Sequence, residues 1–163
     1  MKRQTLIRSA VAAVVVFGMA GCAQMRGSGQ QPAGAPAAGT PAPIYETYRA
    51  TLSPNEEVPP AANSRGTGTA EVRVNIRDNS FTWKTTHSGT TGPITMGHIH
   101  GPAAAGANAG VVVPLQGVEK PSAEGSGKLT AAQYGDLAAG LYYINLHSAQ
   151  YPGGELRGQL RRQ

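Results

Sequence analysis

Cysteine is almost absent from this sequence, and so are long apolar stretches. Cys22 is the only cysteine among 163 residues, so no disulfide can form within the chain. The longest apolar run, residues 10–20, has about eleven residues, whereas a membrane-spanning helix needs roughly 20. The nine acidic residues are scattered, and no Asp-rich loop of the kind that calcium requires is present. Hard-cation sites and membrane-spanning helices are therefore not expected.

Aromatic residues are scarce as well, at 6% of the chain. The formal net charge is +5, but Lys2, Arg3 and Arg8 supply three of the positive charges within the first 21 residues. The remainder has nearly balanced charge, about +2, and no basic stripe interleaved with aromatic side chains. This composition argues against binding to nucleic acid.

Motifs of common enzyme classes are also missing. Ser148 follows His147 directly, and neighbours on a strand point to opposite faces, so the two do not form a nucleophile and base pair. The stretch "GPAAAGANAG" is rich in glycine but lacks the Lys-Ser/Thr of a phosphate-binding loop. No repeat of 20–50 residues indicates a solenoid.

The first 22 residues have the pattern of an export signal. A basic start precedes the apolar run, which ends in "GMAGC". Small residues before a cysteine resemble the lipobox of bacterial lipoproteins, although Met19 stands where Leu is usual. The resemblance implies that residues 1–21 are a lipoprotein signal peptide and that Cys22 carries a lipid that attaches the protein to a membrane. We expect a periplasm-facing protein of the bacterial cell envelope, and Ala23, which is not Asp, favours the outer membrane over the inner.

Two further regions follow the cysteine. The stretch from Cys22 to residue 43 is rich in Gly, Pro and Ala and has no hydrophobic periodicity. Such a segment buries too little apolar surface to offset its ordering entropy, so it predicts a disordered, flexible linker. Residues 44–163 are predicted to form one domain.

Strand patterns dominate that domain. In "GTAEVRVNI", Ala70, Val72, Val74 and Ile76 alternate with polar residues, which is typical of a half-buried strand. Further strands are predicted at residues 45–53, 81–87, 95–100, 110–115, 127–129, 141–147 and 154–160. Residues 130–140 predict one short helix. The fold class is therefore all-β, an antiparallel Greek-key β-sandwich or barrel with one short helix.

Four histidines are the main candidates for chemistry. In "TMGHIH", Met96, His98 and His100 share one strand face, and residues i and i+2 lie close enough to bind one metal ion. His147 and His87 each lie at the end of a predicted strand, and His147 is on the face opposite the apolar residues of its strand. Whether the four converge depends on a strand order that the sequence does not give.

Copper is the metal that this donor set favours. Neutral imidazole suits zinc, copper, nickel and iron, and the thioether of Met96 would tilt the choice toward reduced copper. The alternatives are that Met96 fills a gap in the core and that the histidines only hydrogen-bond loops to the backbone. In that case the protein would be a metal-free structural domain that binds an envelope protein.

The closing segment "YPGGELRGQL" predicts a β-hairpin. Gly153 and Gly154 would supply the positive φ that its turn needs. Glu155 and Arg157 lie on one face of the second strand, which is typical of a solvated surface.

Two stretches resemble a known family. "MGHIHGPAAAGANAGVVVPL" and "LYYINLHSAQYPGGELRGQL" resemble the CHRD domain, which is named for chordin and is common in exported bacterial proteins. "YRATLSPNEEVPPAANSRGTGTAEVRV" fits the start of that domain. The resemblance implies an all-β module and does not define a biochemical role.

A fainter resemblance is to copper/zinc superoxide dismutases, which hold copper with a His-x-His strand and a later histidine. By pattern alone, His98, His100 and His147 would be these ligands, and the third interpretation is a copper-dependent dismutase. The pattern departs from that family, because His87 precedes the pair and the loop after it has no His or Asp for a zinc subsite. Arg157 matches the family's arginine only loosely.

Overall fold

The computed structural model describes residues 41–163. The predicted signal peptide, Cys22 and most of the predicted linker lie outside the described residues. In residues 41–163, no helix combines the length and the apolar content that crossing a membrane demands.

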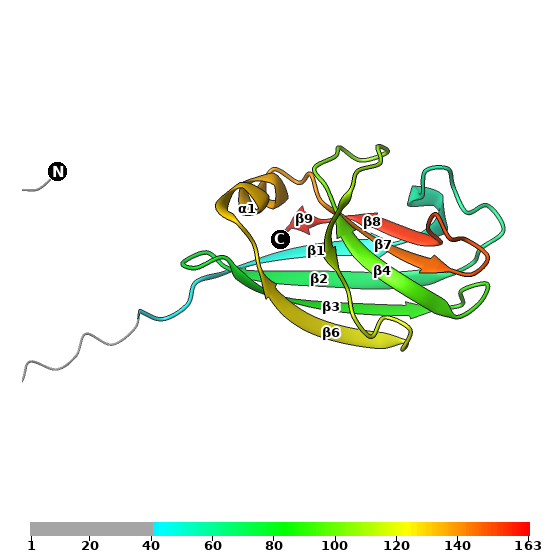
Figure 1. Ribbon diagram of the computed structural model, residues 1–163, viewed down its shortest axis with the longest axis horizontal. Coiled ribbons are helices and arrows are strands. Elements are labelled where there is room, and N and C mark those ends of the chain that lie inside the picture. Colours follow the sequence, from blue (N-terminus) through cyan, green and yellow to red (C-terminus); the bar gives the residue numbers. More distant parts are fainter. Residues whose placement is uncertain (1–40) are drawn as a thin grey trace, which may run out of the picture. The chain divides into compact units, whose positions relative to one another are not determined.

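Two antiparallel sheets form the domain, as the all-β prediction required (Figure 1). The first has the order β6-β3-β2-β1-β9 and the second the order β5-β4-β7-β8. The strands of the first sheet are β1 (Tyr45–Leu52), β2 (Thr67–Asn75), β3 (Ser80–Ser88), β6 (Ser122–Lys128) and β9 (Arg161–Arg162). Those of the second are β4 (Ile94–His100), β5 (Val111–Pro114), β7 (Tyr143–Ser148) and β8 (Leu156–Gln159).

Two helices complete the fold. The predicted helix is α1 (Ala131–Ala138), which begins at Thr130 with a capping box: Gln133 N–H donates to the Thr130 hydroxyl, and Thr130 N–H donates to the Gln133 side chain. A 3-10 helix, η1 (Pro54–Glu56), follows β1. Ser53 exchanges two backbone hydrogen bonds with Arg157, of 2.9 and 3.1 Å, which holds η1 against β8.

The core lies between the inner faces of the two sheets. Alternation along β2 buries Ala70, Val72 and Val74, and along β7 it buries Ile144 and Leu146. Ile76 does not follow this prediction. It lies beyond the end of β2 and is 37% exposed. Strand β6 begins earlier than predicted, at Ser122 instead of Gly127. Residues 122–126, "SAEGS", have no apolar alternation, and only their pairing with β3 identifies them as strand.

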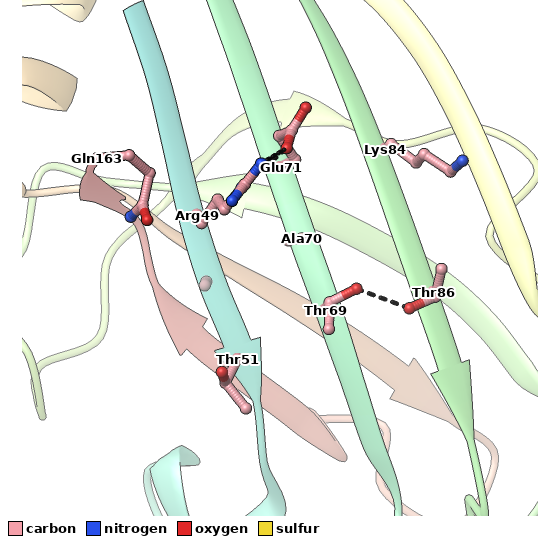
Figure 2. A pocket seen from close by; sticks show the side chains of 9 residues that line it. Arg49, Thr51, Thr69, Ala70, Glu71, Lys84, Thr86 and Gln163 are labelled. Atoms are coloured by element: carbon pink, nitrogen blue, oxygen red, sulfur yellow. Dashed lines mark hydrogen bonds and ion pairs between the residues drawn. The ribbon is translucent and has the colours of Figure 1, made fainter.

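The outer face of the first sheet is polar. Figure 2 shows it close by: Arg49 of β1 bonds to Glu71 of β2, and Thr69 of β2 bonds to Thr86 of β3. These pairs stand directly opposite each other in the strand register. An exposed Arg–Glu pair of this kind contributes under about 1 kcal/mol, so this face reads as a solvated surface.

The outer face of the second sheet is different, because all six residues of β7 are buried. Two irregular segments cover the polar residues of this face. Asn145 of β7 donates to Glu57, which follows η1, and Arg157 of β8 donates to Asn108 in the loop of residues 101–110. Arg157 is 2% exposed and Glu155 is fully buried, so the prediction of a solvated face on β8 was wrong. The local sequence of β8 is typical of a strand at the edge of a sheet. It gives no sign that the segment after η1 and the 101–110 loop cover its outer face.

Candidate metal centre

Three of the four histidines converge on this covered face. Strands β4 and β7 pair so that His98 lies opposite Asn145 and Met96 lies opposite His147. One ring nitrogen from each of His98, His100 and His147 lies within 4.8 Å of the others. His98 Nδ1 and His147 Nε2 are 3.0 Å apart, which is a hydrogen-bond distance.

Backbone carbonyls orient two of the rings. His100 Nδ1 donates to Ala109 O at 3.0 Å, and His147 Nδ1 donates to Pro152 O at 2.9 Å. A carbonyl oxygen only accepts, so Nδ1 carries the proton on both rings and Nε2 keeps its lone pair. A partner at the far nitrogen is the usual way that a metal-ligating histidine is held.

One of these lone pairs has no partner at all. His100 Nε2 is buried and makes no hydrogen bond in the described part of the chain. An unpaired buried polar atom destabilises a fold by about 1–3 kcal/mol. A metal ion in the cluster would satisfy this nitrogen together with those of His98 and His147.

The distances fit a metal ion, as do the tautomers of His100 and His147, whereas His98 Nδ1 donates to His147 Nε2 and a metal ion would break this bond when it binds both rings. Nitrogens that bind one ion at about 2.0 Å stand roughly 3–4 Å apart, so the cluster needs only a small contraction. Burial lowers the pKa of His98, and burial is also the largest cause of the lowered pKa of His100 and of His147. The lowered pKa keeps the rings neutral, which is the form that binds metal.

The other two predicted ligands lie in different places. Met96 is on the same outer face, directly across from His147, with 47% of its surface exposed. It therefore lies at the solvent side of the cluster. His87 lies at the end of β3 in the other sheet, where its Nε2 is 2.9 Å from Val118 O and 3.0 Å from Lys120 O. The structure does not bring His87 to the cluster.

An aromatic and cationic wall borders the cluster. The ring of Tyr143 is parallel to that of His100, with centroids 4.9 Å apart, and the guanidinium of Arg157 lies 3.6 Å from the Tyr143 centroid. Strand β7 runs between β4 and β8, so Tyr143 separates the histidine from the arginine. Arg157 also donates to Ala107 O and, at 2.8 Å, to Asn108 Oδ1, which holds the 101–110 loop over the site.

A buried carboxyl group lies beside the cluster. Glu57 is 4% exposed and accepts a short hydrogen bond from the amide of Asn145. Burial raises the pKa of Glu57 to about 7, against the opposing effects of the Arg157 charge and the bonds from Val58 and Asn145. The side-chain oxygen of Asn145, Oδ1, is buried and has no hydrogen-bond partner in the described residues.

Sequence reasoning missed Tyr143, Asn145 and Glu57 as parts of the site, and it named Arg157 only as a loose match to the dismutase arginine. The pairing of β7 with β8 in a hairpin places Asn145 opposite Arg157. Both lie on the same face as His147, so this register was the signal that could have linked them to the site. Glu57 gave no such signal, because it follows η1 in an irregular segment.

The described residues thus define a two-sheet β-sandwich with a three-histidine cluster on the covered outer face of one sheet. The family model of the CHRD domain matches residues 48–160, and the chain belongs to this family. Searches of curated proteins and of solved structures found no match to the chain.

Proposed function

We propose that this protein is a non-catalytic copper-binding module whose ligands are His98, His100 and His147. The observation that carries the proposal is the unpaired, buried Nε2 of His100, which lies within 4.8 Å of ring nitrogens of the other two. Two of the three rings, those of His100 and His147, keep a lone pair on Nε2 because Nδ1 donates to a backbone carbonyl, which supports a metal site over a set of loop contacts.

Copper is favoured over other ions by the donors at hand. The cluster has nitrogen ligands and a nearby thioether at Met96, without a carboxylate among the three grouped residues. Hard cations prefer oxygen donors, whereas imidazole with thioether suits copper. Storage, delivery or protection of copper in the cell envelope is the role that such a module would have.

The proposed location rests on the sequence. The lipobox-like "GMAGC" supports a lipid on Cys22, and a diacylglyceryl-type anchor holds a protein stably at a membrane. We place the domain on the periplasmic side of the bacterial envelope, at the outer membrane. Radiolabelled palmitate incorporated by the wild type and absent from Cys22→Ser would test the anchor.

A dismutase remains a second candidate for one reason. His98 is only half-buried, so a bound ion would have a solvent-facing side. Against it, Arg157 is separated from His100 by Tyr143 and is bonded to the 101–110 loop. The guanidinium therefore does not face the position where a substrate anion would bind.

Copper titration of the unit Thr40–Gln163 tests the proposal. This unit is compact by itself and contains no cysteine that would compete for copper. Calorimetry and Cu(II) electron paramagnetic resonance would be run on the wild type and on His98→Ala/His100→Ala. His87→Ala is the matched control, because it also removes a partly buried histidine but leaves the cluster intact.

We expect one copper per chain with nitrogen hyperfine coupling in the wild type and in His87→Ala. The double variant should bind at least roughly a hundredfold more weakly, as expected when two of three ligands are lost. Equal binding by all three proteins would overturn the proposal and leave the histidines as loop contacts. Superoxide turnover by the loaded wild type would replace the non-catalytic role with the dismutase.

A further inference from the structure

Exposed apolar side chains gather at the end of the sandwich where the described chain begins. Ile44, Tyr45 and Ile76 are 48%, 50% and 37% exposed. Ile76 N–H donates to Ile44 O at 2.9 Å, so the start of β1 and the β2–β3 turn lie side by side. Figure 1 shows this turn and the start of β1 at the same end of the domain.

Two arginines are bound to this apolar edge. Arg77 Nε donates to Ala42 O at 2.8 Å, and the guanidinium of Arg73 lies 4.6 Å from the centroid of the Tyr45 ring. Both side chains are exposed. By strand alternation Ile44 and Ile76 lie on the side of Val72 and Val74, and Tyr45 and Arg73 lie on the opposite side. The end of the sandwich therefore carries three exposed apolar side chains and two cations around its rim.

The nearby carboxylates are engaged elsewhere. Glu46 pairs with Arg162 at 2.7 Å and accepts from Tyr48 and Tyr134. Asp78 accepts from the backbone and the hydroxyl of Ser80. Within residues 41–163, neither Arg73 nor Arg77 has a carboxylate within 4.0 Å, so their charges are free to meet an external anion.

The place of the edge in the chain indicates what that anion is. The segment before Pro41 leaves the domain here, and Cys22, the proposed lipid attachment, stands roughly 20 residues earlier in the sequence. A lipid on Cys22 would keep this end of the domain close to a phospholipid surface.

We propose that the edge formed by Ile44, Tyr45, Ile76, Arg73 and Arg77 docks on anionic phospholipid. The apolar side chains enter the headgroup boundary, and the guanidinium groups bind lipid phosphates. The proposal goes beyond copper binding and does not depend on it. The lipid would hold the protein at the membrane, and the edge would fix the orientation of the domain on the surface.

Cosedimentation with lipid vesicles tests this edge directly. The protein used is the unit Thr40–Gln163, which lacks Cys22 and therefore carries no lipid of its own. The vesicles are phosphatidylethanolamine with roughly 30% phosphatidylglycerol, compared with phosphatidylcholine alone. Arg73→Gln/Arg77→Gln removes the charges, and Ile44→Ser/Ile76→Ser removes apolar area. Lys84→Gln and Val111→Ser are the matched controls, because both residues are exposed away from this edge.

We expect the wild type and both controls to bind the anionic vesicles and not the neutral ones. Arg73→Gln/Arg77→Gln should lower the partition coefficient at least roughly tenfold, because two phosphate-binding charges are lost. Ile44→Ser/Ile76→Ser should lower it at least roughly fivefold, because less apolar area is buried in the headgroup boundary. Equal binding to both vesicles, no binding, or an equal loss in the controls would overturn the proposal. Copper titration of the same variants separates this result from the proposed function, because copper affinity should not change.

Discussion

The guanidinium carbon of Arg157 lies 3.6 Å from the centroid of the Tyr143 ring, and both residues are buried. This cation has neutral acceptors, Ala107 O and Asn108 Oδ1, and no carboxylate within 4.0 Å in the described residues. Its planar group thus joins the 101–110 loop to β7, the strand that carries Tyr143, Asn145 and His147 of the site. Position 157 depends on guanidinium shape as well as on charge.

Arg157→Lys should therefore be costly although it keeps the charge. Lysine cannot stack on Tyr143 and bond both loop acceptors in one plane, so we expect a loss of about 2–4 kcal/mol in the free energy of unfolding. Urea denaturation measures it. Arg49→Lys is the control, because the Arg49 side chain is 61% exposed, and its loss should stay below about 0.5 kcal/mol. Similar small losses at both positions would contradict this account of the loop.

Gly154 and its neighbour Gly153 make a matched pair. A Cβ at Gly154 would collide with the Asn145 amide and the Glu57 carboxyl, and its φ is 138°. A Cβ at Gly153 would meet nothing within 4 Å, and its φ is not positive, contrary to the sequence prediction. We expect Gly154→Ala to lower stability by about 2–4 kcal/mol and Gly153→Ala by less than about 0.5 kcal/mol. Thermal unfolding of both variants would check this, and equal effects would refute the close packing at Glu57.

The raised pKa of Glu57 predicts a pH dependence. Its folded pKa of about 7 lies above its usual value of 4.5, so the folded state holds the proton more tightly than the unfolded state. The stability that this proton contributes is complete below pH 4.5 and is lost as pH rises through 7. Glu57→Gln keeps the acceptor for Asn145 without a charge, so at pH 8 it should be more stable than wild type by about 1–3 kcal/mol.

Urea unfolding without added metal, at pH 4.5 and at pH 8, checks this sign. At pH 4.5, the usual pKa of this carboxyl group, the wild type and Glu57→Gln should have nearly equal free energies of unfolding. A variant that is less stable than wild type at both pH values would show that the carboxylate is ionised and favourable in the folded state.

Local pattern predicted most of the architecture of this domain. Alternation identified β2, β3 and β7, and a threonine able to cap with a glycine able to end a helix identified α1, because each of these depends on residues close in sequence. The pairing of His98 and His100 on one face followed from the two-residue period of a strand.

What the pattern did not predict depends on contacts between distant segments. The convergence of His147 with His98 requires β4 and β7 to be neighbours, and residues 98 and 147 are far apart in sequence. The burial of Arg157 depends on the 101–110 loop, and the exclusion of His87 depends on which sheet β3 joins. Charged residues on a strand at the edge of a sheet normally predict exposure to solvent. In β8, Arg157 is buried, because the segment after η1 and the 101–110 loop cover it.

Met96 provides a test of which oxidation state of copper the site prefers. It lies across from His147 at the exposed side of the cluster, and a thioether ligand favours reduced copper. Met96→Leu retains the volume and removes the sulfur. If Met96 completes the site, the variant should bind Cu(I) roughly tenfold more weakly, while Cu(II) affinity, which depends on the histidines, changes less than about twofold.

Competition titrations with a Cu(I) chelator and with a Cu(II) chelator measure the two affinities. Ile44→Ala, an exposed apolar position just before β1 of the other sheet, should leave both affinities unchanged. An unchanged Cu(I) affinity in Met96→Leu would show that the three histidines bind copper alone. Because Met96 is on the solvent side, that result would also mean that the fourth coordination position is open to an external ligand, as a redox centre requires.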